Sequence, residues 1–429
     1  MHYDDYLSDH ELYCVLAEVA NQPKVFGILS SEEQVFVEDL KREFESSGVH
    51  INDAERKHRL LQLQAKIASL ESQYLRNAFG GDSTFTFGPV DDPNSYFAIR
   101  EYLEKFADQT EAPPKYLICP SQSDVISQMI LNLPDRKVRQ ALWRGSVKAP
   151  EENAECLGEL IKTRQLTAKD LGYRSHAHKV LSARMAKTPE NVQSMLRSIL
   201  SEIEESVEKE LQLLDSGRDA LFPWNANYLI RRKALESKEM GNTDPLLALK
   251  SYLSLSSVFE GLKYLLHELF SIQMQVGPVP SNEAWGGQQD PSNSGMYKIT
   301  LQSCGEHLGT VYIDAYRRRN KMNQAAHLTI QCGCVDTKAV VDGILKGEYR
   351  HWLPLPRQDP VVTLLFDFAP SVNGELLLSF QELETVYHEF GHALHSILSR
   401  TTYQHLSGTR GGVDFVEVVT LSVLLWLVH

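Results

Sequence analysis

Apolar side chains recur at steps of three and four through much of the first 270 residues, a period that predicts helices. The clearest case is residues 52–81, where one apolar stripe is formed by Leu60, Leu63, Ile67, Leu70 and Tyr74. Asn52 is the expected N-cap, Glu55 stands three residues later as in a capping box, and the Gly80–Gly81 pair can end the helix. We expect the stripe to pack into a core.

The same helical period returns in residues 123–146 and again in residues 189–214. Residues 87–96 contain Gly and Pro and predict a loop between these helices and the first one. The strongest interruption in the chain is the stretch 277–295, which is rich in Gly, Pro, Ser and Asn. It predicts a loop or a boundary.

After this interruption the pattern becomes extended. Runs of β-branched and aromatic residues with partial alternation predict strands over residues 297–303, 309–316, 327–333 and 361–368. A helix is predicted next over residues 378–398, with apolar side chains available for burial at Leu383, Val386, Tyr387, Phe390, Leu394 and Leu398. The pattern therefore predicts a mainly α fold with a small β-sheet beside this last helix.

The composition is that of a globular chain, with 429 residues, of which 42% are apolar and 23% charged. This length leaves room for two or three domains. The formal net charge of -13 argues against a nucleic-acid partner and suits cationic ligands such as basic peptides.

The six cysteines show no spacing typical of a disulfide framework, which favours a reducing compartment. Cys332 and Cys334 form a lone C-x-C pair, for which reduced structural thiols are favoured over a metal site. The N-terminus is acidic, with no Lys or Arg before Lys24, and predicts neither a transit peptide nor a secretion signal. The apolar run Val418–Val428 is too short for a bilayer that needs about 20 residues, so we expect no membrane span.

The helix predicted over residues 378–398 contains an H-E-x-x-H motif. Residues four apart share a helix face, so His388 and His392 can direct their imidazoles at one metal ion. Glu389 can then face the attacking water as general base. Zinc in such a site lowers the pKa of its water and polarises the scissile carbonyl.

A catalytic zinc site needs a third protein ligand and one open position. The candidates after the helix are His405, Asp414, Glu417 and His429. Glu417 has apolar neighbours on both sides, a setting in which a carboxylate is either paired or bound to a cation. The chemistry favours Glu417 over His405 by about two to one and leaves His405 open.

Other polar residues near the motif have weaker claims. His395 lies near the same helix face, but three ligands on consecutive turns would strain a tetrahedral site, so a packing or outer-sphere role is favoured. Glu384 is a weak candidate for the outer sphere, and Asp414 is predicted to cap the helix that carries Glu417.

These residues resemble peptidase family M3, the thimet oligopeptidase and neurolysin group. The sequence HEFGHALH matches the hallmark HEFGHxxH, and DFVE, which ends at Glu417, matches the D-F-x-E segment of the third ligand. The resemblance implies one Zn²⁺ ion held by His388, His392 and Glu417. It further implies that Glu389 is the catalytic base, and that the fold is a neurolysin-like multi-helix peptidase with a deep channel.

Three stretches are most similar to the mitochondrial intermediate peptidase branch of that family: LGYRSHAHKVLSARMAKTPENVQSML, LGTVYIDAYRR and SRTTYQHLSGTR. This resemblance implies a metalloendopeptidase of the mitochondrial matrix that removes octapeptides from imported precursor intermediates, with Arg-rich presequence remnants as substrates. The alternatives are a general oligopeptidase of the cytosol and a catalytically impaired form.

The resemblance stops within a residue or two of Glu417. We expect the C-terminal part of the family's channel, with its oxyanion-stabilising residues, to be missing after Val418, and upstream helices to be missing as well. Such a chain is expected to be weakly active or inactive, even when it binds zinc. The predicted organisation is an N-terminal helical region over residues 1–130 and an M3 catalytic region over residues 131–429.

Overall fold

The computed structural model describes residues 9–79, 85–87, 107–108, 115–118, 123–214, 221–239, 252–285, 295–318, 321–322, 324–346, 355–369 and 376–418. The chain forms two compact units. The first contains Met1–His50, Ala183–Ala186 and Pro245–His429, and the second contains Ile51–Ser182 and Lys187–Asp244. The predicted division at residue 130 concerns the extent of the catalytic region, and it stays a prediction.

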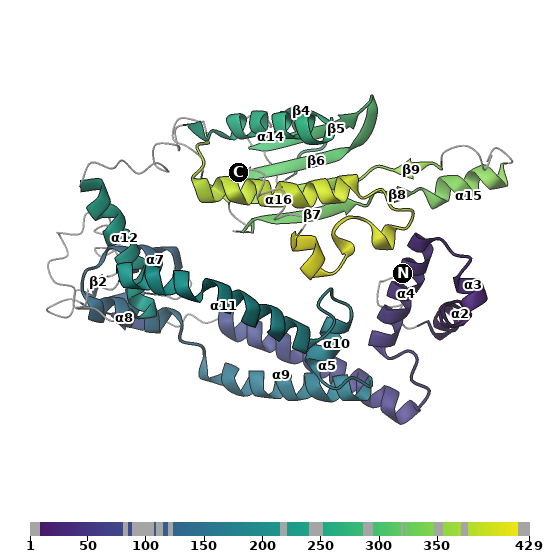
Figure 1. Ribbon diagram of the computed structural model, residues 1–429, viewed down its shortest axis with the longest axis horizontal. Helices are drawn as coiled ribbons and strands as arrows, with labels where there is room; N and C mark the ends of the chain where they lie inside the picture. Colours follow the sequence, from purple (N-terminus) through teal and green to yellow (C-terminus); the bar gives the residue numbers. More distant parts are fainter. Residues whose placement is uncertain are drawn as a thin grey trace. The chain divides into compact units, whose positions relative to one another are not determined.

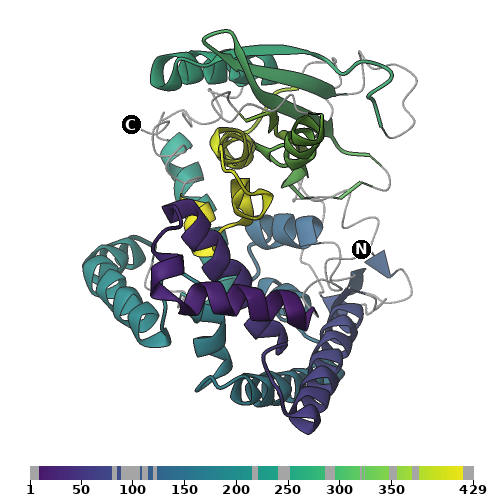
Figure 2. The same cartoon turned by 90° about the vertical axis from the view of Figure 1, so that its right-hand side faces the viewer.

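The second unit is mainly helical (Figures 1 and 2). Its helices are α5 (Ala54–Phe79), α7 (Ser123–Asn132), α8 (Arg136–Ser146), α9 (Glu151–Asp170), α10 (His176–Ser182), α11 (Pro189–Leu214) and α12 (Pro223–Glu239). The predicted apolar stripe lies on a buried or half-buried side of α5, which packs along α9. The Asn77 side chain donates a hydrogen bond of 2.9 Å to that of Asn153, so polar contacts also join these two helices.

The helices predicted over residues 123–146 and 189–214 are confirmed, but the cap of α5 differs from the prediction. The carboxylate of Asp53, not the side chain of Asn52, accepts hydrogen bonds from the N–H groups that follow, at 2.9 Å from Glu55. The predicted Gly80–Gly81 stop lies outside the described residues, as does nearly all of the predicted loop over residues 87–96.

The helical reading of the first 270 residues missed a small antiparallel sheet. Its strands are β1 (Phe85–Phe87), β2 (Ala107–Asp108) and β3 (Lys115–Ile118), in the order β1-β3-β2. The rings of Phe87 and Tyr116 stack with centroids 5.1 Å apart, and both side chains are buried against α7 and α8. These strands are too short for a period of two to show in the sequence.

The first unit is built around a five-stranded sheet of order β4-β5-β6-β10-β7. Its strands are β4 (Gln273–Pro278), β5 (Met296–Ser303), β6 (Glu306–Tyr316), β7 (Ala326–Gln331) and β10 (Val361–Phe368). Neighbours pair antiparallel except β6 and β10, which run parallel. The four predicted strands are thus confirmed. Residues 279–285 form turns and irregular backbone, so the predicted loop is confirmed there, while residues 286–294 lie outside the described residues. The strands on either side pair within one unit, so the prediction of a boundary is wrong.

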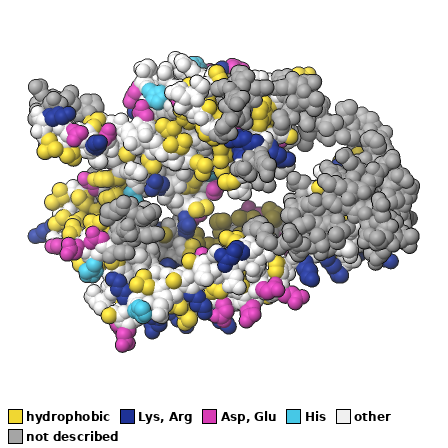
Figure 3. Space-filling model, turned by 180° about the vertical axis from the view of Figure 1, so that it is seen from behind, with side chains coloured by type: hydrophobic (Ala, Val, Ile, Leu, Met, Phe, Trp, Pro, Cys, Tyr) yellow, Lys and Arg dark blue, Asp and Glu magenta, His cyan; other side chains and the backbone are white. Residues whose placement is uncertain are grey.

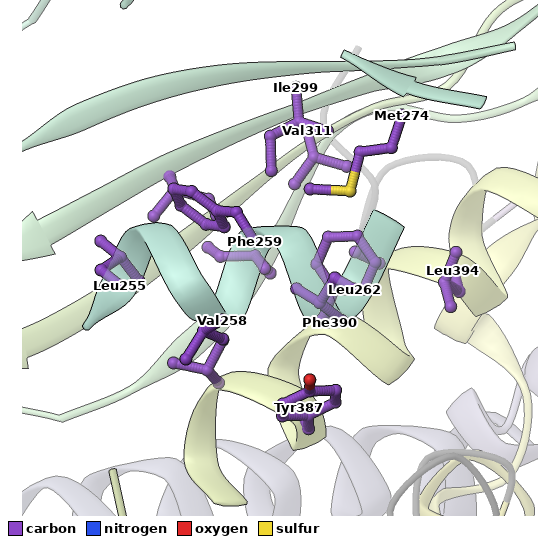
Figure 4. Close-up of a cluster of buried hydrophobic side chains, with 14 of the residues drawn as sticks. Leu255, Val258, Phe259, Leu262, Met274, Ile299, Val311, Tyr387, Phe390 and Leu394 are labelled. Atoms are coloured by element: carbon purple, nitrogen blue, oxygen red, sulfur yellow. The ribbon is translucent and has the colours of Figure 1, made fainter. Parts of the chain in front are cut away.

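Two helices, α14 (Leu255–Phe270) and α16 (Phe380–Leu398), pack with this sheet into the largest core of the described residues. Figure 4 shows Phe259 and Leu262 of α14 beside Phe390 of α16, below Val311 of the sheet. The helix predicted over residues 378–398 is therefore α16, and the small sheet does lie beside it. The prediction of a mainly helical fold with this arrangement is confirmed.

The first unit also contains short elements around this core. They are α2 (His10–Asn21), α3 (Pro23–Phe26), α4 (Ser31–Ser47), α15 (Thr337–Leu345), β8 (Cys334–Val335), β9 (Arg357–Gln358) and the 3₁₀ turns η4 (Gln404–Leu406) and η5 (Gly408–Arg410). Cys332 and Cys334 are buried and unbridged, as favoured from the sequence.

None of the helices in the described part of the chain is both long enough and apolar enough to cross a membrane. On the face seen in Figure 3, blue Lys and Arg side chains are interspersed with magenta acidic and yellow hydrophobic ones.

The N-terminus of α16 is fixed by a capping box that sequence analysis did not identify. The Ser379 hydroxyl accepts a hydrogen bond from the N–H of Glu382 at 3.2 Å, and the Glu382 carboxylate accepts one from the N–H of Ser379 at 2.7 Å. Two of the N–H groups that a helix start leaves unpaired are satisfied in this way.

We predict that Ser379→Ala lowers the local unfolding free energy of α16 by about 1 kcal/mol, because the capping hydroxyl is lost. Native-state hydrogen exchange on the amides of α16 measures this change. The matched control is Thr385→Ala on the same helix. The Thr385 hydroxyl donates a hydrogen bond of 2.9 Å to the Gln381 carbonyl within the helix and has no capping role. Equal exchange in both variants would contradict the prediction.

Candidate active site

Packing of α16 determines where its two motif histidines point. Val386, Phe390, Ala393 and Ile397 are fully or almost fully buried in the core, so this face of the helix is fixed against the sheet. His388 and His392 lie one turn apart beside it, with ring centroids separated by 4.9 Å and ring planes at 90°. Two imidazoles are therefore presented to one point from a rigid helix.

Glu417 approaches the same point from the short helix formed by residues 413–418. Its Oε2 lies 3.5 Å from Nε2 of His388 and 3.6 Å from Nε2 of His392. One ligand atom from each of the three residues lies within 4.8 Å of the others. Bonds of about 2.0–2.2 Å in a tetrahedral zinc site would put ligand atoms roughly 3.4 Å apart, so this donor set fits one zinc ion.

Glu389 lies beside these three residues and is buried. Burial raises the pKa of its carboxyl to about 7, with a further contribution from the negative charge of Glu417 and an opposing one from the backbone N–H of His327. A divalent cation in the site would lower the pKa of Glu389 and so oppose the increases caused by burial and by the charge of Glu417. Without a cation, the carboxyl therefore keeps its proton to a higher pH than an ordinary glutamate does.

A cavity of about 350 Å³ opens at this point, lined by Glu389, His392, Glu417 and His327 among others. Burial lowers the pKa of His392, and this favours the neutral imidazole that binds metals. The site therefore combines two imidazoles, one carboxylate, an adjacent acid–base group and space for a ligand.

His327, on β7, is a site residue that sequence analysis missed. Its ring lies 5.9 Å from that of His392, and its Nε2 is 3.2 Å from the Ser396 hydroxyl. Burial is the main cause that lowers its pKa to about 4, so the ring is neutral at neutral pH. The only sequence signal is its position in a predicted strand, because nothing in the motif indicates that β7 lies beside α16.

Comparison with known proteins identifies the family of this chain. The sequence profile of peptidase family M3 matches residues 129–429, which is well over half of the chain. The chain belongs to peptidase family M3. Members of this family are in general zinc metalloenzymes, and the resemblance noted from the HEFGHALH and DFVE segments is confirmed.

Curated relatives carry the name mitochondrial intermediate peptidase. That of Aspergillus fumigatus (strain CBS 144.89 / FGSC A1163 / CEA10) is 28% identical over 424 residues, covering 94% of this chain and 51% of the relative. Those of Candida glabrata and Candida albicans are 26% and 27% identical and cover 95% of this chain. This M3 chain spans about half the length of the curated relatives it matches.

Among the residues that the structure describes, the other candidate ligands do not lie at the site. His405 lies against α4, where its Nε2 is 3.5 Å from a carboxylate oxygen of Glu43. His395 packs edge-on against Phe415 with ring centroids 6.0 Å apart, which agrees with the packing role favoured from the sequence. Glu384 is exposed on α16, and His429 lies outside the described residues.

The predicted capping role of Asp414 is wrong. Its Oδ2 accepts a hydrogen bond of 2.7 Å from the N–H of Met185 and one of 3.3 Å from the N–H of Ala186. The carboxylate therefore binds a distant segment of the first unit and does not cap its own helix. The result is a fixed point three residues before Glu417.

Gly408 lies between α16 and Glu417 and has a left-handed backbone conformation. Its φ is +63°, and an added Cβ would lie 3.0 Å from the Ser396 hydroxyl oxygen. Gly411, only three residues later, would place a Cβ at ordinary contact distances of 3.7 and 3.8 Å, and its φ of -68° suits any residue.

We predict that Gly408→Ala destabilises residues 404–418 by about 1–2 kcal/mol, because the left-handed conformation penalises a Cβ. Hydrogen exchange of this segment measures the change. Gly411→Ala is the matched control in the same loop and should stay within about 0.5 kcal/mol of the unmodified chain. A loss in the control as large as that in Gly408→Ala would show that the backbone argument is wrong.

Proposed function

We propose that this M3 chain is a zinc metalloendopeptidase, with one zinc ion held by His388, His392 and Glu417. The observation that carries the proposal is the approach of the Glu417 carboxylate to both imidazoles, at 3.5 and 3.6 Å, from a second helix. Exposed acidic groups are common without a bound metal ion, but here residues from two helices converge on one point beside the buried carboxyl of Glu389.

In this proposal zinc supplies Lewis acidity, which polarises the scissile carbonyl and makes water acidic near pH 7. Glu389 accepts a proton from the attacking water and then donates it to the nitrogen of the leaving amine. Glu389 is placed for both proton transfers, because it lines the cavity together with His392 and Glu417. His327 holds Glu389 through its backbone N–H.

The substrate would be an unfolded peptide held in extended form beside β7. In the described sheet this strand pairs with β10 on one side only, and most of its side chains are exposed. Ala326 and His327 of β7 line the cavity of the site. An extended peptide can add to such an edge through backbone hydrogen bonds, which places its carbonyl near Glu389.

We further propose that the substrates are imported mitochondrial precursor intermediates, from which an octapeptide is removed in the matrix. The relatives named mitochondrial intermediate peptidase and the acidic net charge of -13 support this choice. An acidic protein attracts Arg-rich peptides at long range.

The first prediction of this proposal concerns metal binding. The purified chain should bind one zinc ion, and His392→Ala should weaken binding by more than about 100-fold, since a ligand contributes more than an outer-sphere partner. Competition with a chromophoric chelator measures the dissociation constant. His267→Ala is the control, because His267 is exposed on α14. Unchanged affinity in His392→Ala would exclude this site as the zinc site.

The second prediction concerns catalysis. Glu389→Gln should keep zinc and lower kcat by about 10²–10⁴-fold, because the side chain can no longer accept a proton. Cleavage of a quenched fluorescent peptide by zinc-loaded protein measures this ratio. Glu384→Gln, exposed one helical turn before His388, should leave the rate unchanged. Cleavage that persists in Glu389→Gln or in excess chelator would contradict the mechanism.

The same assay tests the substrate class. A presequence-intermediate peptide with an N-terminal octapeptide should be cleaved once, at the octapeptide junction, with a higher kcat/KM than a scrambled peptide of equal charge. Equal rates on both peptides would favour a general oligopeptidase. Absence of cleavage by a folded, zinc-loaded sample would contradict peptidase activity of this chain.

A further inference from the structure

One face of α4 carries three side chains directed at the loop that follows α16. Glu32, Phe36 and Glu43 are spaced by four and seven residues, which places them on one side of the helix. The helix start is well fixed, because Ser30 and Glu33 form a reciprocal capping box. Leu40 and Phe44 anchor α4 in its own small core with α2.

Each of these three side chains meets a residue of the loop 399–410. The Glu32 carboxylate accepts hydrogen bonds from the N–H of Thr402 and, at 2.8 Å, from the Thr402 hydroxyl. The ring of Phe36 stacks on that of Tyr403 with centroids 4.3 Å apart and planes at 12°. Glu43 lies 3.5 Å from His405. Hydrogen bonds to a charged acceptor are stronger than neutral ones, so the Thr402 contact is the main polar link.

The opposite side of this loop contacts the neighbourhood of the metal ligands. The Ser407 hydroxyl donates to the Gly333 carbonyl at 2.9 Å, and the N–H of Gly408 donates to the Ser399 hydroxyl at 3.0 Å. Gly408 packs against Ser396, which is one turn beyond His392 on α16 and also binds His327. The loop is therefore held between α4 and the site.

We propose that Glu32 and Phe36 of α4 are positioning residues for the third zinc ligand, Glu417. The loop that they hold is the covalent connection between the helix of His388 and His392 and the residue that completes the site. A loop free to move away from α16 would carry Glu417 with it, and the site would pay the ordering cost on binding metal. Helix α4 lies outside the residues 129–429 that the family profile matches.

The inference rests on the proposed zinc site, and its test measures zinc affinity rather than activity. Glu32→Ala in the full chain should raise the zinc dissociation constant about ten-fold, the size of effect typical of groups that orient ligands. Thr402→Val removes the partner hydroxyl and nearly keeps the shape of the side chain. It should also raise the zinc dissociation constant. Hydrogen exchange should increase in residues 399–418 of both variants.

Glu38→Ala is the matched control, because Glu38 is exposed on the same helix. It should bind zinc like the unmodified chain. Unchanged zinc affinity in Glu32→Ala would overturn the inference. If Glu32→Ala loses its helical circular dichroism, Thr402→Val decides alone, and unchanged affinity there overturns it. Failure of the unmodified chain to bind zinc would instead contradict the proposed function.

Discussion

The structure depends on the packing of α16 against the sheet. A helix can direct two imidazoles four residues apart at one point, but the third ligand must come from elsewhere. The burial of Val386, Phe390, Ala393 and Ile397 removes the rotational freedom of this helix, so His388 and His392 have one orientation in the first unit. The other residues near the site, such as Glu417 and His327, must therefore approach these two imidazoles in that orientation.

The electrostatics of the site favour a cation. Glu389 and Glu417 are two carboxylates close enough for the charge of one to raise the pKa of the other. The neighbouring imidazoles of His327 and His392 cannot compensate, because burial lowers the pKa of both. A buried carboxylate without a positive partner is costly, and a divalent ion removes that cost while it fixes the ligands. Metal binding and local stability are therefore coupled.

Local patterns predicted the elements near the site better than the contacts between them. The strands β5, β6, β7 and β10 and the helix α16 follow from local sequence, because each is a long enough run of β-branched and aromatic residues or of regularly spaced apolar residues. The motif indicated His388 and His392, but the chemistry of the residues alone favoured Glu417 over His405 only by about two to one, and the family resemblance was needed to choose Glu417. In the structure, His405 is held away from the site by contacts with Phe36 and Glu43. These two residues precede His405 by more than 350 positions in the sequence.

The misreadings have the same physical origin. Asp414 is a good N-cap residue, yet its carboxylate binds the N–H groups of Met185 and Ala186, which no local rule can indicate. His327 stands in an ordinary strand and gains its place in the site only because β7 lies beside α16. A side chain that binds a residue distant in the sequence leaves no signal in the residues around it. Such contacts therefore cannot be predicted from neighbours in the sequence.

These long-range contacts are concentrated on one part of the chain. Between His392 and Glu417 the backbone leaves a rigid helix, turns at Gly408 and enters a helix over residues 413–418. Segments around residues 32, 185 and 333 bind this connection through Thr402, Asp414 and Ser407. Because this connection is tethered at several places, most of the entropy that Glu417 would lose as a ligand in the proposed zinc site is already lost on folding. Preorganisation of the proposed third ligand is thus a property of the first unit as well as of the motif near it.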